Sequence, residues 1–307
     1  MSRNEDQTRI RATHPLRFAY LGALHFLPQL ARADFKKLTR FEQTRRVLVD
    51  FICEIGVEFR LKPRVWHMAV SYLDRILPEV KGRDKILVAI TCILLAAKFD
   101  ENSSNLPRFQ EVLEFSQLKN NHNKDVNQTA LKHLTSKDIL TMEKFIFEKL
   151  DYRLFAITPV HLLEYYLIVG VVSYTCGDQV EDLNVVENAL ALEVREYCKF
   201  FLDMILWHVE FQSCPVHHIA AAIIACARHA AGIQPIWSRF LSELTEFPFT
   251  GEIILLQERL WEVYAIEWRR RQPIKPDDKL EKDSPQGVSD ILFSNQSEGS
   301  KKPKFSG

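Results

Sequence analysis

The chain has 307 residues, of which 47% are apolar and 26% are charged, so it can bury a core and form one or two domains of ordinary size. Only ten residues are glycine, which argues against phosphate-binding loops and hairpin-rich β folds and favours long helices. Forty basic residues balance forty acidic ones, and this formal net charge of zero disfavours nucleic acid as the main partner.

The longest apolar stretch, residues 86–97, is interrupted by a single threonine. A membrane-spanning helix needs about 20 residues, so this stretch predicts a buried helix, and we expect neither a membrane partner nor a secretory signal. None of the six cysteines lies in a C-x-x-C pair. We interpret them as small buried side chains in a reducing compartment, not as disulfides or zinc ligands.

The first half of the chain predicts five helices around one apolar centre. Apolar residues recur at helical spacing over residues 41–61, and Pro63 opens a second amphipathic helix that ends at Pro78. The segment 84–99 is apolar on all sides, so other helices must surround it. The remaining predicted elements are a short helix over 106–115, a polar surface loop over 117–134 and a helix from Ser136 to Leu150.

The second half opens at Thr158-Pro159, a typical helix start, and repeats the plan of the first. Its central helix, predicted over residues 217–231, is rich in alanine, which lets neighbouring helices approach closely. The helices predicted around it cover residues 159–172, 184–208, 235–245 and 251–268.

These patterns predict an all-α fold built by tandem duplication of a five-helix unit, at residues 41–155 and 158–268. Residues 1–40 are predicted to form an N-terminal segment with a short helix. The polar composition after residue 271 predicts a disordered tail over residues 272–307.

The sequence contains no phosphate-binding or dinucleotide glycine pattern, no G-x-S-x-G and no H-E-x-x-H. The adjacent His217 and His218 point about 100° apart on a helix, so we do not expect them to chelate one metal. No nucleophile, general base and electrophile come together. We therefore expect no enzymatic activity, cofactor or metal, and the residues favour a helical binding module.

Three strings resemble the cyclins in their order and spacing: RRVLVDF at 45–51, AVSYLDRIL at 69–77 and LLAAKFDE at 94–101. Met142-Glu143 resembles the start of the family's fifth-helix signature. Further segments, at residues 16–18, 27–28, 161–167 and 220–222, resemble the cyclin J branch. The resemblance implies two tandem cyclin boxes and a non-enzymatic protein that binds and activates a cyclin-dependent protein kinase.

Lys98 and Glu143 match the positions with which cyclins grip backbone groups of the kinase's mobile C-helix. From periodicity alone, Lys98 would only stabilise a helix C-terminus and Glu143 would be an ordinary exposed charge. The resemblance implies instead that both form charge-assisted hydrogen bonds to the partner. The apolar contact positions that the family places around them, for which core packing is the alternative, are Leu95, Phe99, Tyr152 and Leu154.

Arg46 and Asp74 match a buried ion pair that joins the first two helices of the family, so we expect them to be structural. Many cyclins also dock substrates or inhibitors on the first helix. An arginine here takes an apolar position of that patch, which puts ordinary docking in doubt. The residues matched to the patch are Arg45, Leu48, Phe51, Glu54 and Ile86.

Other functions stay open from the sequence. A transcription-factor-type cyclin fold that binds DNA would require a basic second repeat, whereas this repeat is acidic at residues 181, 182, 187, 193 and 196. A kinase-independent scaffold fits the sequence as well. Ser284 before Pro285 is a minimal proline-directed phosphorylation site, and a weak lysine cluster at residues 301–304, with the resemblance, leads us to expect the nucleus as well as the cytoplasm.

Overall fold

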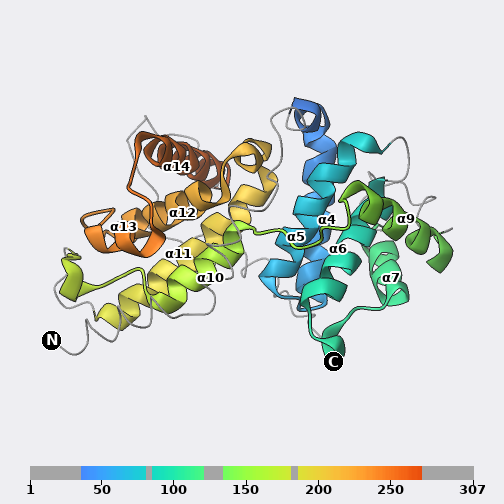
Figure 1. Cartoon of the computed structure of the whole chain (residues 1–307), viewed down its shortest axis with the longest axis horizontal. Coiled ribbons are helices and arrows are strands. Elements are labelled where there is room, and N and C mark those ends of the chain that lie inside the picture. The colour runs from blue at the N-terminus through green and yellow to red at the C-terminus, as the bar shows by residue number, and fades with distance from the viewer. Residues whose placement is uncertain (1–35, 81–84, 121–133, 181–185, 272–307) are drawn as a thin grey trace, which may run out of the picture. The chain divides into compact units, whose positions relative to one another are not determined.

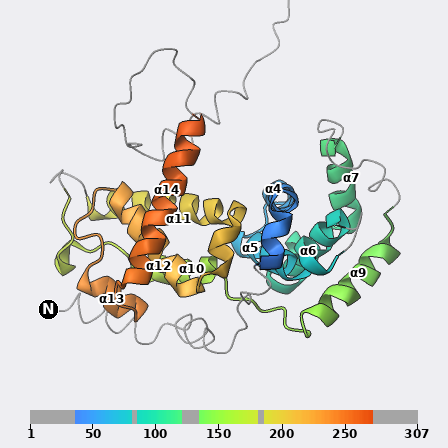
Figure 2. The same cartoon turned by 90° about the horizontal axis from the view of Figure 1, so that it is seen from above.

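The computed structural model describes residues 36–80, 85–120, 134–180 and 186–271. Within these ranges the chain is helical and contains no β-strand, apart from an isolated bridge between Gln179 and Gln234. The chain divides into two compact units (Figures 1 and 2). Among the described residues, the N-terminal unit contains residues 36–162 and 205–216, and the C-terminal unit contains residues 163–204 and 217–271.

The predicted all-α class and the tandem arrangement of five-helix units are confirmed. The predicted tail at 272–307, Ser284 within it, and most of the predicted N-terminal segment lie outside the described residues. So does most of the predicted loop at 117–134, although its first residues belong to a helix.

The first set of helices consists of α4 (Glu42–Glu58), α5 (Pro63–Ile76), α6 (Lys85–Asp100), α7 (Phe109–Asn120) and α9 (Ser136–Lys149).

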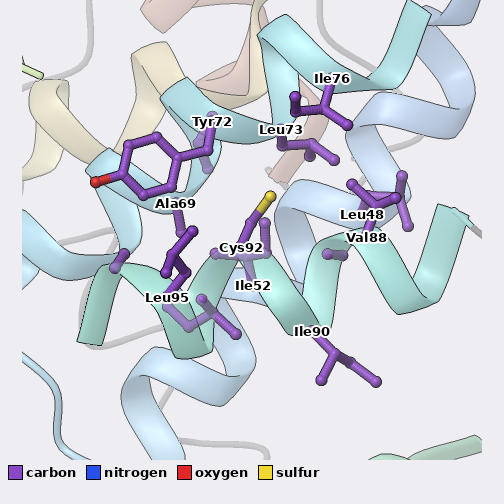
Figure 3. Close-up of a cluster of buried hydrophobic side chains, with 14 of the residues drawn as sticks. Leu48, Ile52, Ala69, Tyr72, Leu73, Ile76, Val88, Ile90, Cys92 and Leu95 are labelled. Atoms are coloured by element: carbon purple, nitrogen blue, oxygen red, sulfur yellow. The ribbon is translucent and has the colours of Figure 1, made fainter. Parts of the chain in front are cut away.

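Helix α6 is the centre of the N-terminal unit and contacts α4, α5 and α9. Every side chain from Leu87 to Ala97 is buried, as the uniformly apolar sequence requires. Figure 3 shows side chains of α4 and α5, among them Ile52 and Leu73, gathered against this helix. The hydroxyl of Thr91, the one polar side chain of the run, donates to the Leu87 carbonyl at 2.6 Å, so no hydrogen-bonding group is left unmet there.

The close approach of α5 to α4 depends on Gly56. A Cβ atom at this position would overlap the ring of Trp66, so any larger residue would push the two helices apart. Pro63 stands at the start of α5, where its missing N–H breaks no helical hydrogen bond. The packing of α4 and α5 therefore follows from a glycine and a proline that the sequence places at the right points.

The second set of helices consists of α10 (Pro159–Val169), α11 (Glu187–Trp207), α12 (Val216–Ala230), α13 (Arg239–Thr245) and α14 (Gly251–Arg271). In the C-terminal unit, α12 takes the central place, and its residues from Ile219 to Arg228 are all buried. Aromatic side chains join α11 to α14, where the ring centroids of Phe201 and Tyr264 lie 5.4 Å apart. In the described parts of the chain, no helix combines the length and the hydropathy that crossing a bilayer requires.

Candidate functional site

An ion pair between Lys98 and Glu143 joins the last turn of α6 to α9. Lys98 is the first exposed residue after the buried run of α6, at a helix end where a cation is favoured. Its side chain is 54% exposed, whereas that of Glu143 is only 11% exposed. The carboxylate is therefore held in place, and the ammonium, which has three donors, keeps room for a second acceptor.

Exposed aromatic side chains lie on the segments that carry the two members of this ion pair and on the turn that follows α9. Phe99 follows Lys98 directly, and its ring centroid lies 6.3 Å from that of Phe155. Tyr152 is also exposed and stacks on Phe147, one turn beyond Glu143 on α9, with centroids 6.1 Å apart. Large exposed apolar side chains that gather beside a fixed charge are typical of a protein-binding surface.

The predicted contact residues divide into three groups. Phe99 and Tyr152 are exposed and accessible to a partner, and Leu154 is half-buried against the core. Leu95 is only 3% exposed, so it packs in the core and is not part of the surface. Phe155 belongs to the surface, but the sequence analysis missed it. The signal was its place in the apolar run that follows α9, which has no helical period to indicate a face.

The turn after α9 holds Tyr152 outward in an uncommon backbone conformation. Asp151 and Tyr152 have φ of 49° and 57°, in the left-handed region that costs a residue other than glycine about 1–2 kcal/mol. The amide N–H of Tyr152 donates to the Phe147 carbonyl at 2.9 Å and helps to hold the turn. The hydroxyl of Tyr72, on α5, donates to the carbonyl of Leu154 and anchors the segment that follows. Strain of this kind, maintained by surrounding contacts, is common at binding sites.

A buried carboxylate fixes the other half of the surface, the end of α6. Glu101 accepts hydrogen bonds from the backbone N–H groups of Lys62 and Asn102, each at 3.0 Å, and pairs with the Lys62 ammonium at 3.0 Å. Burial would raise the pKa of Glu101, but these hydrogen bonds and the lysine charge hold it below its usual value. Arg64 pairs with Asp100 at 3.2 Å one residue earlier. The turn that presents Lys98 is therefore clamped to the start of α5.

The buried side chain of His161 packs against Phe155 and helps to hold the aromatic part of the surface. Its ring packs edge-on against Phe155, with centroids 6.0 Å apart, and its Nδ1 atom accepts from the backbone N–H of Thr158 at 3.2 Å. Burial, followed by the positive charges of Arg64 and His67, lowers the pKa of His161 to about 3. The imidazole is thus neutral at physiological pH and acts as a packing group.

The arrangement is suited to binding. A fixed carboxylate and an exposed ammonium offer one acceptor and several donors, and the aromatic rings exclude water and strengthen hydrogen bonds to a partner. Within the described ranges, no three His, Cys, Asp or Glu side chains are grouped so that they would hold a metal ion.

The predicted ion pair of Arg46 with Asp74 is wrong by one residue. Arg45 is the buried partner: its Nε and Nη2 atoms donate to the two carboxylate oxygens of Asp74 at 2.6 and 2.9 Å. Its Nη1 atom donates to the carbonyl of Leu206 at 2.7 Å. Arg46 lies on the exposed face of α4, close to Asp50. The physical reason is the helical period, because Arg45 shares the buried stripe of α4 and Arg46 does not.

This register also corrects the predicted docking patch. Arg45 is fully buried and Leu48 lies in the core, so neither lines an exposed groove. Phe51 and Ile86 are half-buried against the core, and Glu54 is exposed. The arginine that was expected to disturb the patch therefore points into the unit, and the objection to docking on α4 that rested on Arg45 is removed.

Comparison with known proteins defines the class. Residues 25–155 match the cyclin N-terminal domain, and residues 157–276 match the cyclin C-terminal domain. The chain therefore belongs to the cyclin family, with its two domains in tandem.

Within the family, the chain is similar to the cyclin J proteins. It is 23% identical to a cyclin-J-like protein of Mus musculus over 71% of this chain and 55% of the relative. It is 27% identical to cyclin-J of Homo sapiens over 66% of this chain and 49% of the relative. The chain thus spans about half the length of these relatives. The predicted resemblance to the cyclin J branch is confirmed.

A solved structure has the same fold. A chain of the yeast RNA Pol II CTD kinase CTDK-1 complex superposes with a TM-score of 0.56 at 17% identity, covering 91% of this chain and 86% of that one. At this identity, the similarity establishes the architecture.

Proposed function

We propose that this chain is a regulatory subunit that binds a cyclin-dependent serine/threonine protein kinase and stabilises its active conformation. The observation that carries the proposal is the Lys98–Glu143 ion pair within an exposed aromatic surface. Its charges suit the polar backbone groups at the end of a partner helix. Phe99, Tyr152 and Phe155 suit the apolar face of that helix.

The mechanism follows from the requirements of the kinase. A protein kinase is active when its Lys–Glu ion pair to the C-helix and its metal-binding Asp are both in place. A surface that binds the C-helix only in its inward position raises the population of that state. A shift from 1:99 to 99:1 requires about 5.5 kcal/mol of differential affinity. An interface of standard size, about 1,600 Å², can supply that difference.

Preorganisation of the surface supports this mechanism. The Glu101 clamp fixes the end of α6, and the strained turn at Tyr152 presents its ring before any partner arrives. Binding then costs little additional ordering of side chains, so more of the contact energy is available to favour one partner conformation. In this proposal the chain supplies no catalytic group, and phosphoryl transfer is performed by the kinase.

The biological setting is part of the same proposal. Family membership supports a role in cell-cycle control, with the protein in the nucleus and the cytoplasm. Neither nucleic acid nor a membrane is required as a partner. Substrates or inhibitors of the kinase would dock on the accessible part of α4, next to Phe51 and Glu54.

The test is reconstitution with a panel of purified cyclin-dependent kinases, measuring phosphorylation of a common substrate. The chain is expected to stimulate at least one kinase, and the double variant Lys98→Ala with Glu143→Ala is expected to lose this stimulation while its circular dichroism spectrum is unchanged. The matched control replaces Glu196 and Lys199, an exposed ion pair on α11, by alanine and retains stimulation.

Two results would overturn the proposal. Stimulation by the double variant equal to that of the wild type would show that the surface is not the one used. Kinase binding without stimulation would make the chain a scaffold, not an activator.

A further inference from the structure

Helix α9 carries an exposed leucine that neither the core nor the proposed kinase surface uses. Leu140 is 63% exposed and lies three residues before Glu143 and seven before Phe147. This spacing places the three side chains along one face of the helix. The apolar surface around the ion pair therefore continues towards the N-terminus of α9.

Lysines flank this leucine. Lys137 and Lys144 are both exposed, and Lys98 lies beyond Glu143. The nearby acidic side chains are already engaged: Asp138 accepts from the backbone N–H of Thr135 at 2.8 Å, and Glu148 lies 4.0 Å from Lys144 in an exposed pair. The side of α9 that carries Leu140 thus presents an apolar side chain between cations.

The position of Leu140 is fixed by the rest of the helix. A reciprocal capping box between Thr135 and Asp138 sets the start of α9. Ile139 and Ile146 are buried and, with Glu143, hold the neighbouring face of the helix against the core. Leu140 is therefore displayed on an ordered helix whose packing does not require it.

We propose that Leu140, Lys137 and Lys144 extend the kinase-binding surface and contact a segment of the kinase in which an apolar side chain is flanked by carboxylates. This inference rests on the proposed function and names the chemistry of the partner. Continuity with the ion-pair surface along one helix face supports it, and so do the two exposed lysines that lie one helical turn before and after the leucine on that face. Contacts of this kind select among kinases that share a similar C-helix, because a kinase with basic residues there is repelled.

An exposed leucine is ordinary in itself, so the experiment needs a matched one. Leu192 on α11 is 62% exposed, lies in the second turn of its helix as Leu140 does, and has Glu193 and Glu196 on its exposed side. The proposal predicts opposite results for the two leucines, although their exposure and helical context are alike.

The experiment measures the dissociation constant for a kinase that the wild-type chain stimulates. Leu140→Asp is expected to weaken binding by about tenfold or more, whereas Leu192→Asp is expected to stay within about twofold of the wild type. Lys137→Glu with Lys144→Glu is expected to slow association and to reduce its dependence on salt. Thermal unfolding of each variant confirms that it is folded.

The outcomes separate this inference from the proposed function. If Lys98→Ala with Glu143→Ala abolishes binding while Leu140→Asp binds like the wild type, the extension is wrong and the kinase surface stands. Equal weakening by Leu140→Asp and Leu192→Asp would also overturn the extension, because the effect would not be specific to α9. If no kinase is bound by the wild-type chain, both proposals fail.

Discussion

The third helices of the two units end with a cation at the same position but in opposite environments. Lys98 in α6 and Arg228 in α12 each lie two residues before the end of the helix, directly after an alanine. The Lys98 side chain is 54% exposed and pairs with Glu143, whereas that of Arg228 has no exposed area. The repeated architecture thus uses one position for a surface group in one unit and for an interior group in the other.

The hydrogen bonds of Arg228 explain its burial. Its Nη1 and Nη2 atoms donate to the two carboxylate oxygens of Asp178, each at 2.8 Å. The guanidinium also donates to three backbone carbonyls, those of Val171, Pro235 and Ile236, at 2.7–2.8 Å. All five donors of the arginine are therefore used, and none is left to bind a partner. A cation with saturated donors is structural, and an exposed cation with donors to spare is available for recognition.

The largest expected effect comes from breaking the buried pair. Arg228→Met leaves the Asp178 carboxylate buried without its cation and three carbonyls without their donor. The expected loss is about 3–5 kcal/mol of unfolding free energy. Denaturant unfolding, followed by hydrogen exchange of the α12 amides, measures it. The double variant Arg228→Met with Asp178→Leu should recover part of the loss, because no uncompensated charge stays buried. An unfolding midpoint of Arg228→Met equal to that of the wild type would contradict this account.

The N-terminal unit contains its own buried pair, between Arg45 and Asp74, with one backbone carbonyl as a further acceptor. We expect Arg45→Met to cost about 3 kcal/mol, at the lower end of the range for breaking a buried pair, because fewer acceptors are left unmet. The adjacent Arg46 is exposed, so Arg46→Met should change the unfolding free energy by no more than about 0.5 kcal/mol. The same denaturant experiment compares the two. A larger loss for Arg46→Met would show that the assignment of Arg45 to the interior is wrong.

These arginines also show what could be predicted from the sequence and what was missed. The helical period of α4 was clear, and it placed Leu48 and Ile52 on the buried stripe. Arg45 falls on that same stripe, but family matching assigned the pair to its neighbour. The position of a charged residue on an apolar stripe could therefore have predicted that Arg45 is buried and needs an ionic partner.

The fold was more predictable than the surface. The start of α5 at Pro63, the end of α6 close to Phe99 and the start of α10 at Pro159 follow from proline positions and apolar periods. Phe155 and the turn at Tyr152 could not be predicted, because a segment without regular structure gives no periodic pattern. The near-complete burial of Leu95 likewise depends on how the surrounding helices pack, which no local pattern encodes.

The two units are also expected to differ, by a smaller amount, in how their unfolding free energy depends on pH. The pKa of His161 is about 3 in the folded chain and about 6.5 when the chain is unfolded. Between these values the unfolded state binds more protons, so stability is complete above pH 6.5 and falls as the pH is lowered towards 3. Each unit of pH within this window costs up to about 1.4 kcal/mol. Between pH 6.5 and 4.5 the carboxyl of Glu101 contributes little, because its pKa lies below its ordinary value of 4.5. Burial raises the pKa of Asp50, so the contribution of His161 is the difference between the wild type and a variant that lacks this histidine.

The measurement is the unfolding free energy of the N-terminal unit between pH 7 and 4.5, in the wild type and in His161→Gln. The variant should show a flatter pH dependence over this range. The control is His229→Gln in the C-terminal unit, where the histidine is exposed and burial lowers the pKa less strongly. If the pH dependence of His161→Gln matched that of the wild type, the acid sensitivity would have to come from other groups.

The loss of stability expected at Lys98 is smaller than that at either buried arginine, and here the comparison between the two cations is sharpest. Lys98→Met removes an ion pair whose ammonium is 54% exposed, so solvent screens its charge. We expect a loss of about 1 kcal/mol, at the upper end of the range for exposed pairs, because the Glu143 carboxylate is only 11% exposed. Its unfolding midpoint should therefore stay close to that of the wild type, while stimulation of the kinase falls. Arg228→Met, at the same position of the repeat, should show the opposite on both measures: its unfolding midpoint falls, and stimulation of the kinase by the folded protein is retained. A loss of stability in Lys98→Met as large as that in Arg228→Met would mean that both cations are structural, because a residue kept for recognition does not hold its own unit together.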